Sequence, residues 1–123
     1  MKKQHFLSAQ DILASDDIEV KDVEMPEWKG PDGTVGIVRL RSLTNDQLVE
    51  YTELIKDEAA RRQGNIMLVY KSAVKEDGTP LFSKDQLEGL QKKASKPFNR
   101  LAKAALVLNG VSAPDEVEKA KND

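Results

Sequence analysis

Hydrophobic and polar residues alternate along residues 18–25 and again along 35–41, which is the period-two pattern of strands that bury one face. A Gly-Pro-Asp-Gly turn at 30–33 separates the two stretches, and these residue types meet the dihedral requirements of a tight turn. The pattern predicts a β-hairpin near the N-terminus. The alternation changes phase at Lys21 and Asp22, where we expect a β-bulge to absorb the extra residue.

Apolar residues recur at helical spacing in the rest of the chain. Helices are expected at about 8–14, 44–62, 66–74, 83–94 and 97–108, with a last charged helix from Ser112. Gly64 is expected to break the helix before it, and Asn109-Gly110 to end the helix before them. The predicted fold class is mainly α (α+β), a single small domain spanning 1–123 with five to six helices and one N-terminal β-hairpin. We expect residues 1–6 and 119–123 to fray.

Three similar hexamers, LSAQDI, LTNDQL and FSKDQL, stand at the start of predicted helices. In each, a Ser or Thr can cap the free backbone N–H groups, while the Asp or Gln three residues later accepts from the cap residue's own N–H. The apolar residues at either end, such as Phe82 and Leu87, can form a hydrophobic staple. The hexamers are therefore predicted to be helix starts. A catalytic motif is disfavoured because His5 is the only histidine and no second base serves the hydroxyls.

The charge balance argues against a nucleic-acid partner. The 123 residues carry 19 Lys and Arg against 21 Asp and Glu, a formal net charge of -2, which provides no global field for phosphate. A local basic cluster is a candidate, but only Phe98, an expected core residue, interleaves it. Its members are Lys92, Lys93, Lys96, Arg100 and Lys103.

No constellation of residues supports catalysis or cofactor binding. The absence of cysteine excludes disulfides, thiol catalysis and cysteine-ligated zinc. The acidic stretch 16–24 lacks the spacing and the glycine of a calcium loop, and the glycines between 30 and 36 do not form a phosphate loop. The N-terminus has no apolar run typical of a signal peptide, and no stretch approaches the roughly 20 apolar residues of a membrane span. We expect a cytoplasmic, non-enzymatic interaction domain without cofactor, metal or membrane partner.

Trp28 is the only tryptophan and lies beside the predicted hairpin turn. An exposed tryptophan often anchors an interface, whereas tryptophan is also a residue that covers the edge of a core. Both interpretations of Trp28 stay open at the level of sequence.

The order of four segments resembles the tail assembly chaperones of long-tailed (siphovirus-type) bacteriophages. The segments are LSAQDILASDDIEVKDVEMPEW, VGIVRLRSLTNDQLVEY, VKEDGTPLFSKDQLEGL and FNRLAKAALVLNGVS. The resemblance spans Leu7 to about Glu118. Its most telling pieces are the opening LSAQDIL, the acidic strand ending in PEW, and the EDGTPLFS turn with the later RLAKAALVLNG.

This resemblance implies a protein of the host cytoplasm that binds the tape measure protein, keeps it soluble, helps to recruit tail tube subunits and is absent from the mature virion. It also implies a longer frameshifted form of the protein as a partner, and self-association is compatible with it. The expected client-binding residues are Trp28, Phe82 and Leu87, with capping and core packing as the alternative role of the last two. Two alternative functions are a structural head–tail or tail component of the virion and a small nucleic-acid-binding regulator.

Overall fold

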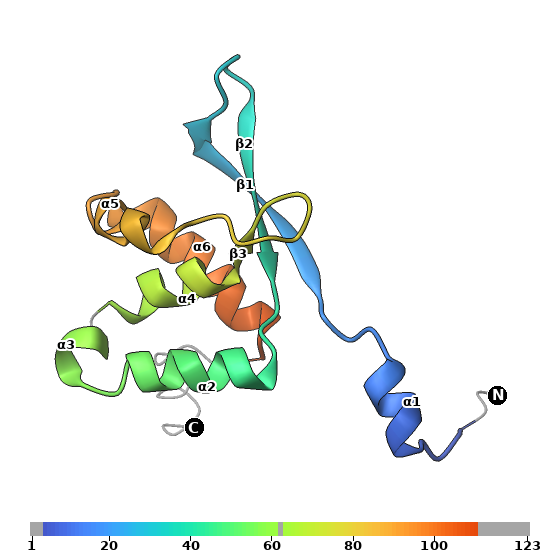
Figure 1. Cartoon of the computed structure of the whole chain (residues 1–123). Helices are drawn as coiled ribbons and strands as arrows, with labels where there is room; N and C mark the ends of the chain where they lie inside the picture. The colour runs from blue at the N-terminus through green and yellow to red at the C-terminus, as the bar shows by residue number, and fades with distance from the viewer. Residues whose placement is uncertain (1–3, 62, 111–123) are drawn as a thin grey trace, which may run out of the picture.

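The packed part of the molecule, called the body below, begins with the β-hairpin. The computed structural model describes residues 4–61 and 63–110. Strand β1 (Val20–Lys29) pairs antiparallel with β2 (Val35–Arg41), and the two-residue strand β3 (Ala73–Val74) lies on the other side of β2. The sheet therefore has the order β1-β2-β3 (Figure 1). The predicted hairpin is confirmed, although β1 is longer than expected.

The predicted bulge at Lys21 and Asp22 is wrong. The strands pair without a break from Val20 opposite Arg41 to Met25 opposite Gly36. The change of phase in the sequence has a simpler cause, because Val20 lies on the outer face of the sheet and is 54% exposed.

The irregularity lies instead between Met25 and Lys29. Residues 26–28 have no partner on β2, since Lys29 already pairs with Val35. A Cβ atom on Gly36 would lie 1.8 Å from the carbonyl oxygen of Trp28. Glycine at position 36 is thus what allows the bulged segment to approach β2.

The predicted helix 44–62 is interrupted. Helix α2 (Asn45–Leu54) begins at a capping box between Thr44 and Gln47, as predicted. It stops before Asp57, whose carboxylate accepts the backbone N–H of Ala60 at 2.7 Å. That bond starts a new helix, α3 (Glu58–Arg61), because a capping aspartate competes with continuation of the preceding helix.

Helix α4 (Gly64–Ser72) passes through the centre of the body. The helix before Gly64 ends at Arg61, as predicted, and Gly64 is the buried first residue of the next helix. The helix ends two residues before the predicted 74, because Ala73 and Val74 form β3 against Leu40 and Arg39. The EDGTPLFS segment begins with the turn expected of it, with Gly78 at φ 90°.

The C-terminal helices follow the prediction more closely. The Ser83 cap starts a 3-10 turn, η1 (Lys84–Gln86), which continues as α5 (Leu87–Gln91) and ends three residues before the predicted 94. Helix α6 (Ser95–Leu108) has Pro97 in its first turn, where the missing N–H costs nothing. Gly110, at φ 68°, ends it as predicted. The predicted last helix from Ser112 lies outside the described residues.

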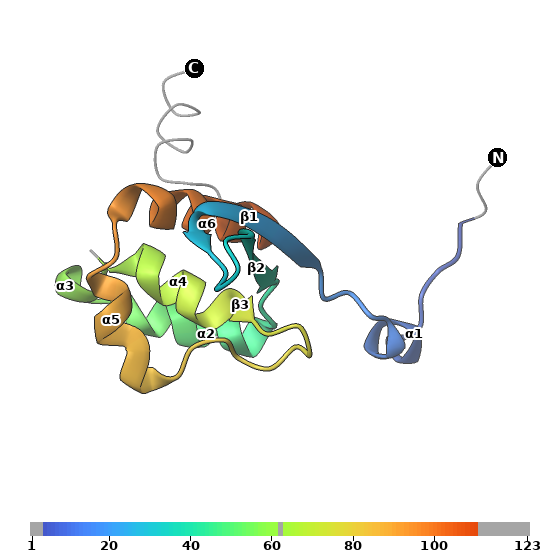
Figure 2. The same ribbon diagram turned by 90° about the horizontal axis from the view of Figure 1, so that it is seen from above.

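The core lies between the inner face of the sheet, α4 and α6 (Figure 2). Its buried apolar members come from every layer and are Met25, Val38, Leu40, Leu68, Val69, Ala73, Leu90, Phe98, Leu101, Ala102 and Ala105. The predicted fold class is confirmed: over the described residues the chain is a small α+β domain with six α-helices and one three-stranded sheet.

Helix α1 (Ala9–Ala14) is the exception to this packing. It begins at the predicted capping box between Ser8 and Asp11, yet it has no buried residue. Both views show it away from the body, at the end of the segment that leads into β1 (Figures 1 and 2).

Candidate interaction sites

Trp28 lies at the end of β1 and packs on α6. Its ring centroid is 6.2 Å from that of Phe98, with the ring planes tilted by 59°, an arrangement in the favourable range for aromatic pairs. The side chain is half-buried against the core. Trp28 therefore covers the edge of the core and still presents a partly exposed surface beside the hairpin turn.

An ion pair fixes the bulged segment next to Trp28. The guanidinium of Arg100 donates to both carboxylate oxygens of Glu27, at 2.6 and 2.8 Å. These hydrogen bonds lower the pKa of Glu27 to about 2. The hairpin end is thus held on α6 by two side chains in succession, Glu27 and Trp28.

The same contact weakens the basic cluster as a phosphate site. Arg100 is engaged by Glu27, and Lys92 lies 3.6 Å from a carboxylate oxygen of Glu88. Two of the five cations of the cluster therefore already face a carboxylate, which agrees with the near-neutral net charge in disfavouring nucleic acid.

Phe82 and Leu87 lie on either side of the Ser83 cap. Both are half-buried and pack against the core. The Ser83 N–H donates to the side-chain oxygen of Gln86 at 2.9 Å, which is one half of the predicted capping box. The structure places these two residues together at the start of η1 and α5, on a different element from Trp28.

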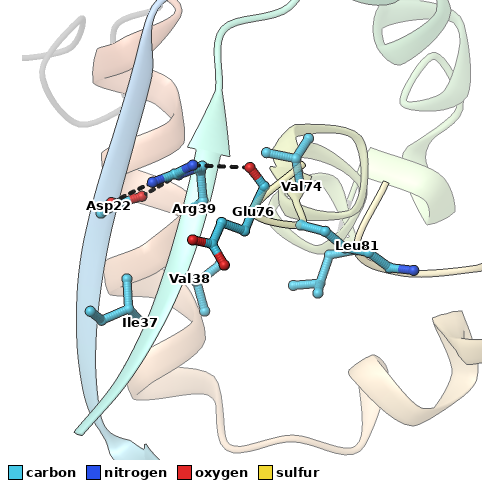
Figure 3. Close-up of a pocket in the computed structure, with 8 residues that line it drawn as sticks. Asp22, Ile37, Val38, Arg39, Val74, Glu76 and Leu81 are labelled. Atoms are coloured by element: carbon cyan, nitrogen blue, oxygen red, sulfur yellow. Dashed lines mark hydrogen bonds and ion pairs between the residues drawn. The ribbon is translucent and has the colours of Figure 1, made fainter. Parts of the chain in front are cut away.

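A cleft of about 530 Å³ lies against β2 and was not anticipated from the sequence (Figure 3). Its lining is apolar in part and charged in part, and consists of Asp22, Ile37, Val38, Arg39, Val74, Lys75, Glu76 and Leu81. The sequence held one indication of the polar part of this cleft. A hairpin that pairs 18–25 with 35–41 can place Asp22 opposite Arg39.

Arg39 organises the polar part of this cleft. Its guanidinium donates to both carboxylate oxygens of Asp22, at 2.7 and 3.0 Å, and to the carbonyl oxygen of Glu76 at 3.2 Å (Figure 3). The hydrogen bonds from Arg39 lower the pKa of Asp22. Asp22, a member of the acidic stretch 16–24, is thus one half of a cross-strand ion pair.

The largest exposed apolar side chains lie in the N-terminal arm, which we define as residues 4–19. Phe6 is fully exposed and Leu13 is 85% exposed. Leu7 and Ile12, predicted to form a hydrophobic staple, are both more than half exposed. Phe6 belongs to the segment 1–6, which is expected to fray, so the sequence pattern predicts no role for it.

Two kinds of feature, a metal-binding cluster and a membrane-spanning helix, are not found among the described residues. Across 4–61 and 63–110, no three His, Cys, Asp or Glu side chains are grouped so as to hold a metal ion. In the same part of the chain, no helix is long and apolar enough to cross a membrane.

Comparison with known proteins agrees with the fold described above. No protein-family model matches the chain, and no curated protein matches it. Among solved structures, the chain is similar to the bacteriophage HK97 tail assembly chaperone, with a TM-score of 0.59 and 23% sequence identity over 85% of this chain and 95% of the HK97 chain. The chain therefore has the fold of a phage tail assembly chaperone, the class that the order of its sequence segments resembles.

Proposed function

We propose that this chain is a phage tail assembly chaperone. In this proposal it binds the tape measure protein in the host cytoplasm, keeps it soluble, helps to recruit tail tube subunits and leaves before the virion is complete. A longer frameshifted form of the chain would join it on the same client.

One observation carries the proposal: the fold similarity to the HK97 tail assembly chaperone extends over 95% of that chain. It supports the same class of protein as the order of segments in the sequence does.

The surface around Trp28 and the surface around Phe82 and Leu87 are the proposed contacts with the client. All three side chains are half-buried, so each has an exposed part to offer and a buried part that anchors it. Amphipathic helices commonly bind in shallow apolar grooves, and many copies along one long client would add avidity to a modest single affinity.

Co-expression tests this proposal. The chain is produced with the tape measure protein encoded downstream of it, and the complex is purified through a tag on the tape measure protein. We expect the tape measure protein to be insoluble alone and soluble with many copies of this chain. A tape measure protein whose solubility is unchanged, with no co-purification, would overturn the proposal.

Mass spectrometry of purified particles then separates the proposal from its main alternative. A chaperone is expected in infected cells and not in particles. A head–tail or tail component of the virion would persist in particles at a fixed number of copies.

A further inference from the structure

Helix α6 presents a row of cations on its outer face. The face that packs on the body consists of Pro97, Phe98, Leu101, Ala102 and Ala105. The opposite face carries Lys96, Arg100 and Lys103, which are all exposed and whose spacing of four and three residues aligns them along the helix. One turn further, Val107 continues the row and is 64% exposed. We call these four residues the basic stripe.

The sequence around the basic stripe carries charge of one sign. Residues 89–110 contain five Lys or Arg and no Asp or Glu, although the whole chain has a net charge of only -2. Lys92 and Lys93 follow α5 shortly before the stripe, and both are exposed. A surface that carries one sign of charge attracts partners of the opposite sign. The balance of the whole chain therefore conceals a locally basic surface.

The two ends of the stripe are available to a partner. Across residues 4–61 and 63–110, no carboxylate lies within ion-pairing distance of Lys96 or Lys103. Arg100, between them, is held by Glu27. The stripe thus offers one cation at each end and a neutralised pair at its centre.

The Glu27–Arg100 pair determines which kind of anion fits the stripe. The side chain of Glu27 is 38% exposed, so a continuous polyanion such as nucleic acid would bring phosphates close to a carboxylate. A protein helix avoids this repulsion, because it can carry carboxylates at two separate positions with a neutral residue between them. The exposed side chain of Val107 also offers apolar contact, which favours a protein partner over a phosphate backbone.

We propose that the basic stripe binds an acidic amphipathic helix of a partner protein. Lys96 and Lys103 are about 10.5 Å apart along the axis of α6, so two carboxylates seven residues apart on the partner helix would face them. A neutral side chain between the carboxylates would face the Glu27–Arg100 pair, and an apolar side chain one turn beyond would cover Val107. This inference concerns the surface of α6 alone and does not rest on the proposed function.

Titration of the isotope-labelled full chain with a synthetic helix, followed by amide chemical shifts, tests the proposal and detects weak contacts. The peptide carries two glutamates seven residues apart, a glutamine between them and a leucine one turn beyond, on an alanine-rich background that favours helix. We expect the largest shifts at residues 96–107. Binding should weaken as salt is added, because salt screens exposed charges.

A pair of double variants makes the test specific. Lys96→Gln/Lys103→Gln should bind the peptide about 2- to 30-fold more weakly, the range expected for the loss of two exposed ion pairs. The matched control Lys56→Gln/Lys84→Gln removes the same charge at two exposed positions outside the stripe and should bind like wild type. All four lysines are exposed, so circular dichroism should show unchanged folds.

A charge swap gives an independent measurement. A peptide with lysine in place of both glutamates should not bind wild type but should bind Lys96→Glu/Lys103→Glu. Absence of shifts with the acidic peptide, or equal weakening in the stripe variant and the control, would overturn the proposal. Tighter binding of a duplex DNA oligonucleotide than of the peptide would assign the stripe to nucleic acid and would also overturn it. Self-association that is lost only in the stripe variant, measured by sedimentation velocity, would make a second copy the occupant, with the same consequence.

Discussion

Replacing Gly36 with alanine tests the close approach on which the bulge of β1 depends. The added Cβ would lie 1.8 Å from the carbonyl oxygen of Trp28 and 3.0 Å from its carbonyl carbon. Both are backbone atoms, so no side-chain rotation relieves the clash, and the bulged segment must move by at least about 1 Å. The effect is purely steric, because the φ of Gly36 is not in the left-handed region.

The cost can be estimated from what the movement breaks. Half of the burial of a large apolar side chain is worth about 1–1.5 kcal/mol, and the aromatic contact of Trp28 with Phe98 adds about 0.5–1.5 kcal/mol. The ion pair of Glu27 with Arg100 is exposed and contributes little. We therefore expect Gly36→Ala to lower the free energy of unfolding by about 1.5–3 kcal/mol.

Urea unfolding followed by tryptophan fluorescence measures this directly, since Trp28 is the only tryptophan. With a denaturant dependence of about 1–3 kcal/mol per M, the midpoint should fall by about 0.5–3 M. The native emission should also shift toward that of an exposed indole, because the ring leaves Phe98.

Gly89→Ala is the matched control. Gly89 lies inside α5, and a Cβ there would meet open space, so alanine should stabilise the helix by about 0.5–1 kcal/mol. The steric explanation would be wrong if Gly36→Ala unfolded within 0.5 kcal/mol (about the error of such comparisons) of wild type.

Three further changes test local features of the fold. Ser72 is fully buried and its hydroxyl has no hydrogen-bond partner among the described residues, so Ser72→Ala should raise the free energy of unfolding by about 1 kcal/mol, measured by urea titration; a loss of stability would point to a partner for this hydroxyl. Asp57→Ala removes the cap that accepts the N–H of Ala60 and should cost about 0.5–2 kcal/mol, with a matching loss of helical circular dichroism. Arg100 lowers the pKa of Glu27 from 4.5 to about 2, so the ionised carboxylate stabilises the fold above pH 4.5 and this contribution is lost as the pH falls toward 2. Between pH 4.5 and 2 the thermal midpoint of wild type should therefore fall further than that of Glu27→Gln. Parallel pH profiles of the two proteins would contradict this role of Glu27.

The features predicted correctly from the sequence are those that neighbouring residues determine. Ser8, Thr44 and Ser83 each begin a helix because the capping residues lie within one turn of each other. The hairpin follows from alternation and a turn, and Gly110 ends α6 because glycine readily adopts positive φ.

The predictions of helix bounds and of the bulge were wrong where tertiary packing or a competing local signal decides the structure. Asp57 stood in a stretch with good helical spacing, and its capping role was overlooked in favour of one long helix. Val74 belongs to β3 because it lies beside Arg39 in space, which a helical apolar pattern could not reveal. The bulge was placed four residues too early because the approach of Trp28 to Gly36 is a tertiary contact.

The candidate site was anticipated only in part. Trp28, Phe82 and Leu87 were selected as apolar residues near turns and caps, and the structure places all three at the edge of the core; their role with a client stays a prediction. The cleft could not be predicted from the sequence, because its lining comes from β1, β2 and the segment 74–81, which only the folded sheet brings together.

Stability and binding can be separated on this molecule in some places and not in others. The ring of Trp28 holds the hairpin on Phe98 and its carbonyl lies over Gly36, so a substitution there that abolished client binding would also weaken the fold. Lys96 and Lys103 carry no such double role, because both are exposed and neither belongs to the core. An effect of Lys96→Gln or Lys103→Gln on binding would therefore report contact alone. This makes the basic stripe on α6 a surface from which a role in binding can be inferred without correction for folding.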